Sequence, residues 1–192
     1  MTSLETTTKR PGPVSAAVNI QYFLIALGVL SAIFAAVNGD KINAAAKAEL
    51  ERLDASKLQI DAMANIGGSG ALGLVIAAVS TVVFLLLTIM VAKGKQWARV
   101  TTWVLSGLGL VFSLLGLLGT LALSADDKLA KATEAGMEAA GSWYGPWQTA
   151  YLVLSVLGGL AVIILLALPA AHPFFRKAQP EAVLPPEAYT NS

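Results

Sequence analysis

The stretch "KGKQWAR", residues 93–99, carries three positive charges and no negative one. It separates two runs, residues 67–92 and residues 100–125, that contain no charged side chain. Because so short a linker cannot hold a domain, the two runs predict two apolar helices joined as a tight antiparallel hairpin. The stretch therefore indicates a helical fold whose helices need little contact with water.

The composition of the whole chain is typical of a membrane protein. Of its 192 residues 56% are hydrophobic and 13% are charged, and the mean hydropathy is +0.68. A soluble domain carries about 25% charged residues. The net charge of +1 gives no indication of nucleic-acid binding. With no cysteine and one histidine, the chain also lacks the usual ligands of a metal or cofactor site, and we expect none.

Four segments are long enough to cross a bilayer, which takes about 20 mainly apolar residues in a helix. We assign them to residues 14–37, 70–92, 100–123 and 147–171. Lipid offers no partner to an unpaired backbone group, so helices are expected, and continuous apolar runs argue against a β-barrel. The first run exceeds the ~7–15 apolar residues of a signal peptide, so we expect it to be retained. The predicted fold is an all-α, four-helix transmembrane bundle.

The distribution of cations predicts how these helices are oriented. Lys and Arg concentrate in short cytoplasmic loops because their transfer across the membrane is disfavoured. The linker at residues 93–99 and the tails at residues 1–13 and 172–192 hold seven of the 13 Lys and Arg residues but three of the 12 Asp and Glu residues. We therefore expect both chain ends in the cytoplasm and a multi-pass protein of the plasma membrane.

The same cations are candidates for contact with lipid headgroups. Each Lys or Arg near an anionic membrane surface contributes about 1 kcal/mol of attraction. The candidates beside the spans are Lys93, Lys95, Arg99, Arg176 and Lys177. The segment after the last span is polar and contains proline, so we expect residues 172–192 to be a disordered cytoplasmic tail.

Aromatic side chains mark the ends of the predicted spans. Trp favours the headgroup zone, where its ring is half in lipid and its N–H meets water. Trp97 and Trp103 lie near the start of the third span, and Trp143 and Trp147 lie near the start of the fourth. We expect an interface belt rather than an aromatic ligand cage, with Pro146 in the first turn of the last helix.

The first outer loop, residues 38–69, predicts an extracellular helix. It is rich in Ala, Glu, Lys and Leu, which favour helices. Asn38 or Asp40 could cap its start, and Gly67 and Gly68 could end it. One face of this helix would carry Ile42, Ala46, Leu50, Leu53, Ile60 and Ala64.

The second outer loop, residues 124–146, also predicts a helix. Ser124 and Asp127 have the spacing of a capping box, and Gly141 could end the helix. The carboxylates of this loop lack the alternation of a calcium-binding loop, so no metal site is expected. The two outer helices either pack together as an extracellular cap or form separate, solvated connectors.

Small residues recur on one face of the third span. Gly109, Ser113, Gly116 and Thr120 stand three or four positions apart. Such faces allow close approach of helix backbones in lipid, where the hydrophobic drive for association is missing. We expect this face to pack inside the bundle, with binding to a second copy or another membrane protein as the alternative. Gly158 and Gly159 are the small residues of the fourth span.

The spans contain no acidic, basic or histidine side chain, and their larger polar side chains are Asn19, Gln21 and Gln148. Ionisable residues inside a membrane usually belong to a functional pathway, so their absence argues against a proton-coupled carrier. The sequence also lacks a Ser–His–Asp set, an H-E-x-x-H motif and a phosphate-binding loop. We expect no enzyme. A non-enzymatic scaffold or regulatory protein is the first hypothesis, and a small transporter or channel formed by oligomerisation is the alternative.

Three segments carry a resemblance to known proteins: "RPGPVSAAVNIQYFLIALGVLSA" at residues 10–32, "KGKQWARVTTWVLSGLGLV" at residues 93–111 and "LLALPAAHPFFRKA" at residues 165–178. They resemble a group of uncharacterised four-span membrane proteins of actinobacteria. In that group an Arg-Pro-x-x-Val start, a Gly-x-x-Trp-Ala-Arg hairpin and a Phe-Arg exit from the last helix recur. The resemblance implies a plasma-membrane protein of this layout and carries over no catalytic residue.

Overall fold

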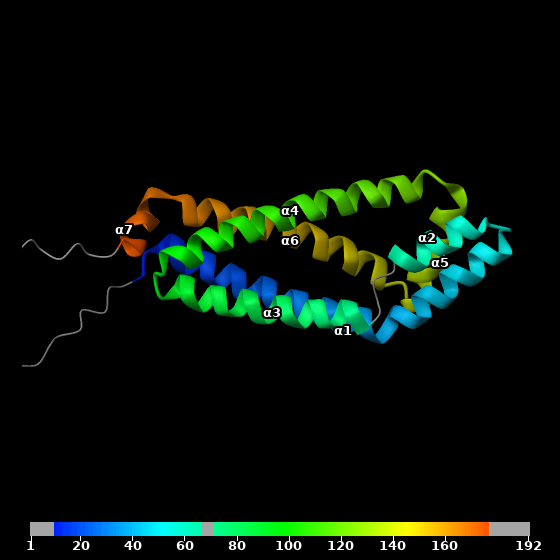
Figure 1. The fold of residues 1–192 in the computed structure, drawn as a ribbon, viewed down its shortest axis with the longest axis horizontal. Helices are drawn as coiled ribbons and strands as arrows, with labels where there is room; N and C mark the ends of the chain where they lie inside the picture. Colours follow the sequence, from blue (N-terminus) through cyan, green and yellow to red (C-terminus); the bar gives the residue numbers. More distant parts are fainter. Residues whose placement is uncertain (1–9, 67–70, 177–192) are drawn as a thin grey trace, which may run out of the picture.

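The computed structural model describes residues 10–66 and 71–176, and these residues form helices and turns without a strand. The helices α1, α3, α4 and α6 are each long and apolar enough to cross a membrane. The predicted all-α, four-helix bundle is therefore confirmed (Figure 1). The elements in chain order are α1 (Gly12–Arg52), α2 (Lys57–Ile66), α3 (Ala71–Ala92), α4 (Gln96–Ser124), α5 (Asp127–Ala140), α6 (Tyr144–Ala167), the 3₁₀ turn η1 (Pro169–Ala171) and α7 (His172–Phe175).

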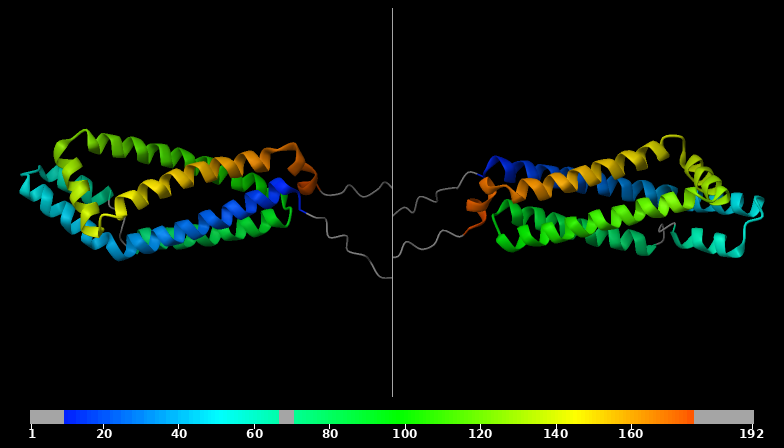
Figure 2. Two further views of the ribbon diagram at one scale, coloured as in Figure 1. Left: turned by 180° about the vertical axis from the view of Figure 1, so that it is seen from behind. Right: turned by 90° about the horizontal axis from the view of Figure 1, so that it is seen from above.

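The four long helices lie side by side, and both ends of the described chain lie at the same end of the bundle (Figures 1 and 2). This end, where α1 begins, α3 turns into α4 and α7 follows α6, is called the terminal end below. The opposite end, which carries α2 and α5, is called the cap end. The main apolar core lies at the terminal end, where Val14, Val91, Ala98 and Leu166 bring the four long helices together.

The turn between α3 and α4 is set by Gly94. Its φ of +72° lies in the left-handed region that glycine favours. The Gly94 N–H donates to the Val91 carbonyl and the Lys95 N–H to the Met90 carbonyl, both at 3.0 Å, which is the pattern of a Schellman motif. A Cβ at Gly94 would also lie 2.9 Å from the carbonyl oxygen of Phe174. The tight hairpin predicted from the sequence therefore depends on this glycine.

The segment after α6 is ordered through residue 176, which corrects the prediction of disorder for its first five residues. Phe175 is buried in the core of the terminal end, and Phe174 packs against that core. The two aromatic rings stack edge to face with their centroids 5.3 Å apart. The prediction overlooked that two adjacent phenylalanines can anchor a short helix despite polar and proline neighbours. Residues 177–192 lie outside the described residues.

Helix α1 runs without a break from the first span into the first outer loop. Asn38 and Gly39 are buried inside this helix, and the Asn38 side chain donates to the Phe34 carbonyl at 2.9 Å. Neither Asn38 nor Asp40 caps a new helix, so that prediction was wrong. At about 1.5 Å per residue the 41 residues of α1 span about 60 Å, twice the thickness of a hydrocarbon core. The outer part of α1 therefore extends beyond any bilayer that its inner part crosses.

The first outer loop holds two helical segments instead of one. The chain reverses after Arg52 at Asp54, whose φ is +52°, and α2 then runs back beside α1. The Ala55 N–H donates to the Leu50 carbonyl at 2.9 Å and closes this turn. The predicted stop at Gly67 and Gly68 lies outside the described residues.

Helix α5 begins two residues later than the predicted capping box. Its N-cap is Asp126, whose Oδ1 accepts from the backbone N–H of Lys128 and of Leu129. Ser124 instead is the last residue of α4, and its hydroxyl donates to the Thr120 carbonyl of the same helix. A serine inside a helix commonly bonds the carbonyl four residues before it, and that bond replaces the predicted cap. The predicted end at Gly141, where φ is +112°, is confirmed.

The outer segments pack together as a cap. Ala46 and Leu50 of α1 and Ala132 of α5 form a second buried cluster, against which Ile60 of α2 packs. A Cβ at Gly136 of α5 would lie 3.0 Å from the Ile42 carbonyl oxygen, so the backbones of α5 and α1 are close.

Polar contacts join the same segments. Gln59 Nε2 donates to Asp126 Oδ2 at 2.9 Å, and Lys128 Nζ donates to the Asp54 carbonyl at 2.8 Å. Of the two possibilities left open by the sequence, the packed cap is the one observed.

Candidate functional site

The small-residue face of α4 makes no close helix–helix contact, contrary to the prediction: Gly109 and Ser113 line a space between the four long helices, and Gly116 and Thr120 are exposed. A Cβ at Gly109 or Gly116 would have no other atom within 4 Å. The hydroxyls of Ser113 and Thr120 donate to the carbonyls of Gly109 and Gly116 in their own helix. Residues 114–122 are exposed on every side of the helix. The reason is that α4 diverges from α3 towards the cap end, so no neighbouring helix covers Gly116 and Thr120 (Figure 1).

Close packing by a small residue occurs on α6 instead. A Cβ at Gly158 would lie 2.8 Å from Leu24 Cδ2 of α1. This glycine lets Leu24 fit against the α6 backbone, as small residues do in membrane helices. Helices α1 and α6 are therefore held together at mid-length, where α4 makes only looser contact with α6.

The divergence of α4 leaves a crevice of about 360 Å³ between the four long helices, called the bundle crevice below. Cavities of 300–1,000 Å³ are the usual size for small-molecule sites. The bundle crevice is lined by Gln21, Leu24, Ile25 and Gly28 of α1, Ala77, Ser80, Thr81, Phe84 and Thr88 of α3, Leu105, Ser106, Gly109, Leu110 and Ser113 of α4, and Tyr151, Ser155, Gly159 and Val162 of α6.

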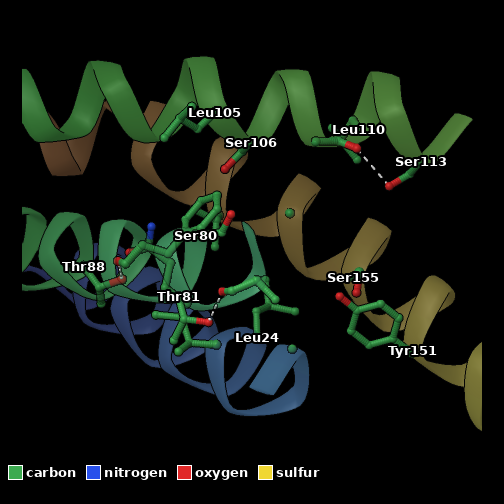
Figure 3. A pocket seen from close by; sticks show the side chains of 18 residues that line it. Leu24, Ser80, Thr81, Thr88, Leu105, Ser106, Leu110, Ser113, Tyr151 and Ser155 are labelled. Carbon is green, nitrogen blue, oxygen red and sulfur yellow. Dashed lines mark hydrogen bonds between the residues drawn. The ribbon is translucent and has the colours of Figure 1, made fainter. Parts of the chain in front are cut away.

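Hydroxyl groups face the bundle crevice from three helices. Figure 3 shows Ser80 of α3, Ser106 of α4 and Ser155 of α6 around the same space. The hydroxyls of Thr81 and Thr88 donate to the Ala77 and Phe84 carbonyls at 2.8 and 2.7 Å, which leaves their lone pairs as acceptors. The crevice is thus a mostly apolar groove with a hydroxyl-bearing wall.

Gln21 supplies the unsatisfied polar group of this site. The residue is 6% exposed and lines the crevice, and its Oε1 is buried without a hydrogen-bond partner. A buried acceptor left unpaired costs about 1–3 kcal/mol. Native proteins rarely keep such groups unless a ligand or a water satisfies them. This acceptor is enclosed by protein atoms, so Gln21 lines the crevice through other atoms of its side chain.

The bundle crevice is closed at the terminal end by the main core. Val18, Leu87 and Leu166 are buried there, next to the depth at which Gln21 and Val162 line the crevice. The closed end lies deep in the apolar part of the bundle, so a polar group at this end is shielded from water.

The predicted headgroup cations divide into two groups. Lys93, Lys95 and Arg176 are exposed at the terminal end, as headgroup contact requires. Arg99 is 5% exposed, and its guanidinium carbon lies 4.6 Å from the ring centroid of Trp103 and 5.1 Å from that of Phe175. Aromatic faces attract a cation by their quadrupole, so the fold draws Arg99 inward and away from lipid headgroups. Lys177 lies outside the described residues.

The predicted tryptophan belt divides in the same way. Trp97 is 57% exposed, and Trp143 is 46% exposed with its ring edge to face with that of Phe34. Trp103 and Trp147 have their Nε1 atoms buried without a partner, and Trp147 packs edge to face on Phe34 with centroids 5.1 Å apart. These two indoles are packing residues, because a belt residue would present its N–H to the headgroup zone.

The crevice offers few groups for catalysis. Its lining contains no Asp, Glu, Lys, Arg, His or Cys side chain, and the phenol of Tyr151 is its one ionisable group. In residues 10–66 and 71–176 no three His, Cys, Asp or Glu side chains group as a metal site. A serine or threonine hydroxyl needs an adjacent general base to act as a nucleophile, and the lining provides none. The arrangement can bind an uncharged molecule.

One pattern in the sequence marks the residues that line this site. Lining residues repeat at intervals of seven: Gln21 and Gly28, Thr81 and Thr88, and Ser106 and Ser113. An interval of seven returns to the same face of a helix. Gln21 has a lining partner seven residues later, at Gly28, whereas Asn19 is not a lining residue and is exposed.

Known proteins add nothing to this geometry, since the chain matches no family model, no curated protein and no solved structure.

Proposed function

We propose that the chain is a non-enzymatic integral membrane protein of the plasma membrane that binds a small uncharged ligand in the bundle crevice and acts as an interaction or regulatory protein. The observation that carries this proposal is the crevice itself. Four helices that could cross a membrane surround a space of about 360 Å³ with a hydroxyl-bearing wall and no acid or base in its lining.

The lining supports binding rather than turnover. Acid–base catalysis most often uses His, Asp, Glu, Lys or Cys side chains, and the lining of the crevice contains none of these. Hydroxyls and one amide can orient a ligand by hydrogen bonds without changing it. The packed cap and the well-filled core at the terminal end give the crevice a firm frame at both ends.

We place the terminal end in the cytoplasm. The exposed cations Lys93, Lys95 and Arg176 lie at this end. Lys and Arg residues in short loops beside membrane helices favour the cytoplasmic side and so set the orientation of the protein. The cap would then lie outside the cell.

Saturable photolabelling tests the proposal. The purified full chain in phosphatidylcholine nanodiscs is illuminated with a diazirine-bearing dodecane, and labelled peptides are identified by mass spectrometry. We expect saturable labels on the peptides of α3, α4 and α6 that contain Ser80, Ser106 and Ser155, suppressed by excess unlabelled dodecane. Labels that rise linearly with probe and fall on outward-facing residues such as Val104 and Val111 would rule out a binding crevice.

A small transporter or channel formed by oligomerisation is the second candidate, and the hydroxyl-bearing wall favours it. The core closes the single bundle at the terminal end, so a continuous path would need a second copy against the exposed half of α4. Flux of a neutral solute such as glycerol from reconstituted vesicles tests this candidate. Under the first proposal the vesicles stay as tight as protein-free controls, and protein-dependent flux would favour the second.

A further inference from the structure

Three serine hydroxyls of the bundle crevice lie at one depth and have no partner in the protein. Resting on the proposed function, we infer that the crevice takes a neutral, membrane-soluble carbonyl compound, of the ketone class, whose oxygen accepts hydrogen bonds from serines among Ser80, Ser106 and Ser155. The ligand enters through the side of the bundle, and its carbonyl oxygen lies near the middle of the membrane.

The three serines belong to different helices but share one level. Ser80 and Ser155 stand 12 residues before the last residues of α3 and α6, and Ser106 stands 10 residues after the first residue of α4. At about 1.5 Å per residue, each serine lies about 15–18 Å from the terminal end of its helix. Half of a hydrocarbon core is about 15 Å thick, so these side chains line the crevice near mid-membrane (Figure 3). They are called the mid-depth serines below.

The mid-depth serines differ from the other hydroxyl residues of the lining. The hydroxyls of Thr81, Thr88 and Ser113 each donate to the carbonyl four residues earlier in their own helix, which satisfies them without a ligand. Within residues 10–66 and 71–176 the mid-depth serines form neither this bond nor any other side-chain hydrogen bond. They are half-buried, and their oxygens are not enclosed by protein atoms, so an occupant of the crevice can reach them.

The partner that each mid-depth serine lacks is an acceptor. A hydroxyl has one proton to donate, and hydrocarbon offers nothing that accepts it. Among backbone groups, unpaired donors are rarer in native proteins than acceptors with an unused lone pair. A carbonyl oxygen has two lone pairs, so it accepts from two of these serines and brings no proton of its own that would need a partner. A plain hydrocarbon would leave all three protons unpaired.

The opening and the charge of the crevice determine the rest of the ligand. Because α4 diverges from α3, the crevice opens at the side of the bundle, which faces hydrocarbon in a membrane, and the main core closes its terminal end (Figure 1). None of the 18 lining residues carries a charge at neutral pH. An ionised ligand would therefore lack a counter-charge at a depth where ionised groups are disfavoured. The ligand is neutral and dissolves in the membrane.

Competition in the full-length protein tests this assignment. The diazirine-bearing dodecane labels the crevice in phosphatidylcholine nanodiscs, and unlabelled dihexyl ketone, the matching secondary alcohol or tridecane competes at measured membrane concentrations. We expect the ketone to displace the probe at about one tenth of the concentration that tridecane needs. Tenfold corresponds to about 1.4 kcal/mol, the size of one hydrogen bond. The alcohol should compete no better than the ketone.

Two variants locate the preference. With Ser80→Ala, Ser106→Ala and Ser155→Ala combined, dihexyl ketone should compete only as well as tridecane. Ser113→Ala removes a lining hydroxyl that is already bonded to the Gly109 carbonyl, so it should leave the tenfold preference intact. Comparing each variant with the unaltered protein cancels differences in membrane partition between the competitors. Thermal unfolding checks the fold, and if the triple variant unfolds, Ser80→Ala with Ser106→Ala should at least halve the preference.

The outcomes separate this inference from the proposed function. Saturable crevice labelling with equal competition by the ketone and tridecane would overturn the carbonyl assignment while leaving the binding crevice in place. A preference that survives in the triple alanine variant, or stronger competition by the alcohol than by the ketone, would also overturn it. No saturable labelling by the dodecane probe would remove both the inference and the proposed function.

Discussion

Gly94 shows how one backbone conformation determines a whole connection. Its positive φ lets α3 end in two backbone hydrogen bonds, and its missing Cβ leaves room for the Phe174 carbonyl from the far end of the chain. The missing Cβ of Gly94 therefore matters for two reasons: it allows the positive φ of the turn, and it leaves room for α7. The neighbouring Lys93 and Lys95 are exposed to the surroundings, whereas position 94 has no room for a side chain.

Gly94→Ala should lower the stability of the bundle. A left-handed conformation costs an alanine about 1–2 kcal/mol, and the Cβ would meet the Phe174 oxygen at 2.9 Å. Thermal unfolding in mild detergent measures the loss. Gly119→Ala on α4 is the control, because nothing lies within 4 Å of its Cβ and alanine favours a helix. Equal effects of the two substitutions would contradict the role of Gly94.

Asp126 gives the cap its dependence on pH. The backbone N–H of Leu129, followed by that of Lys128 and the Gln59 side chain, holds the pKa of the Asp126 carboxyl below its usual range, against an opposing effect of desolvation. A lowered folded-state pKa means that the carboxylate stabilises the cap above the unfolded pKa of about 3.9. That contribution is lost as the pH falls below this value through the folded pKa.

The protection of the α5 amides from hydrogen exchange, relative to the intrinsic exchange rate at each pH, should therefore fall on acidification below about pH 4. Asp126→Asn keeps a good N-cap residue but removes the titrating group, so its exchange should change less over the same pH range. An identical pH profile in the two proteins would show that other carboxylates govern the cap.

At the scale of the elements, the division between span and cap runs through the middle of a helix. Helix α1 passes from the apolar bundle into the cap without a break, and Gly136 of α5 contacts it near Ile42. The cap is thus joined to the bundle through the backbone of α1 and not through a loop.

Gly136→Val should loosen the cap and spare the bundle. The new Cβ would lie 3.0 Å from the Ile42 carbonyl oxygen and 3.1 Å from Ile42 Cγ2, and overpacking of this kind costs about 1–3 kcal/mol. Limited proteolysis at the turn between α1 and α2 measures the loosening. Ala139→Val on the exposed face of α5 is the matched control and should leave the cleavage rate unchanged.

At the scale of the whole molecule, the four long helices meet closely at the terminal end and separate on one side towards the cap (Figure 1). The separation makes the bundle crevice, and it leaves the outer half of α4 without a neighbour. The crevice and the exposed half of α4 have the same cause, which is the divergence of α4 from α3. The same geometry brings both chain ends to one side.

Single thiols should report that arrangement directly, because the chain contains no cysteine. Lys95→Cys in the α3–α4 turn and Ser56→Cys in the α1–α2 turn lie exposed at opposite ends of the molecule. In sealed inside-out vesicles a membrane-impermeant maleimide should label Lys95→Cys and not Ser56→Cys. Labelling of both positions from one side would contradict a bundle that crosses the membrane.

The sequence alone determined the helical class and the four long apolar helices. Lipid leaves a backbone no partner but itself, so length and apolar character suffice to place such helices, and "KGKQWAR" locates their sharpest turn. The end of α5 at Gly141 was equally readable, since glycine there adopts a φ that other residues avoid.

Only the tertiary structure decided how these helices share space. The small residues of α4 have the spacing of a packing face, yet Gly158 of α6 makes the close contact, because spacing marks a permissive surface and does not say which neighbour arrives. In the same way, Arg99 turns inward and Gln21 becomes an unpaired acceptor only because residues distant in sequence surround them. Burial depends on three-dimensional neighbours, and no local pattern specifies them.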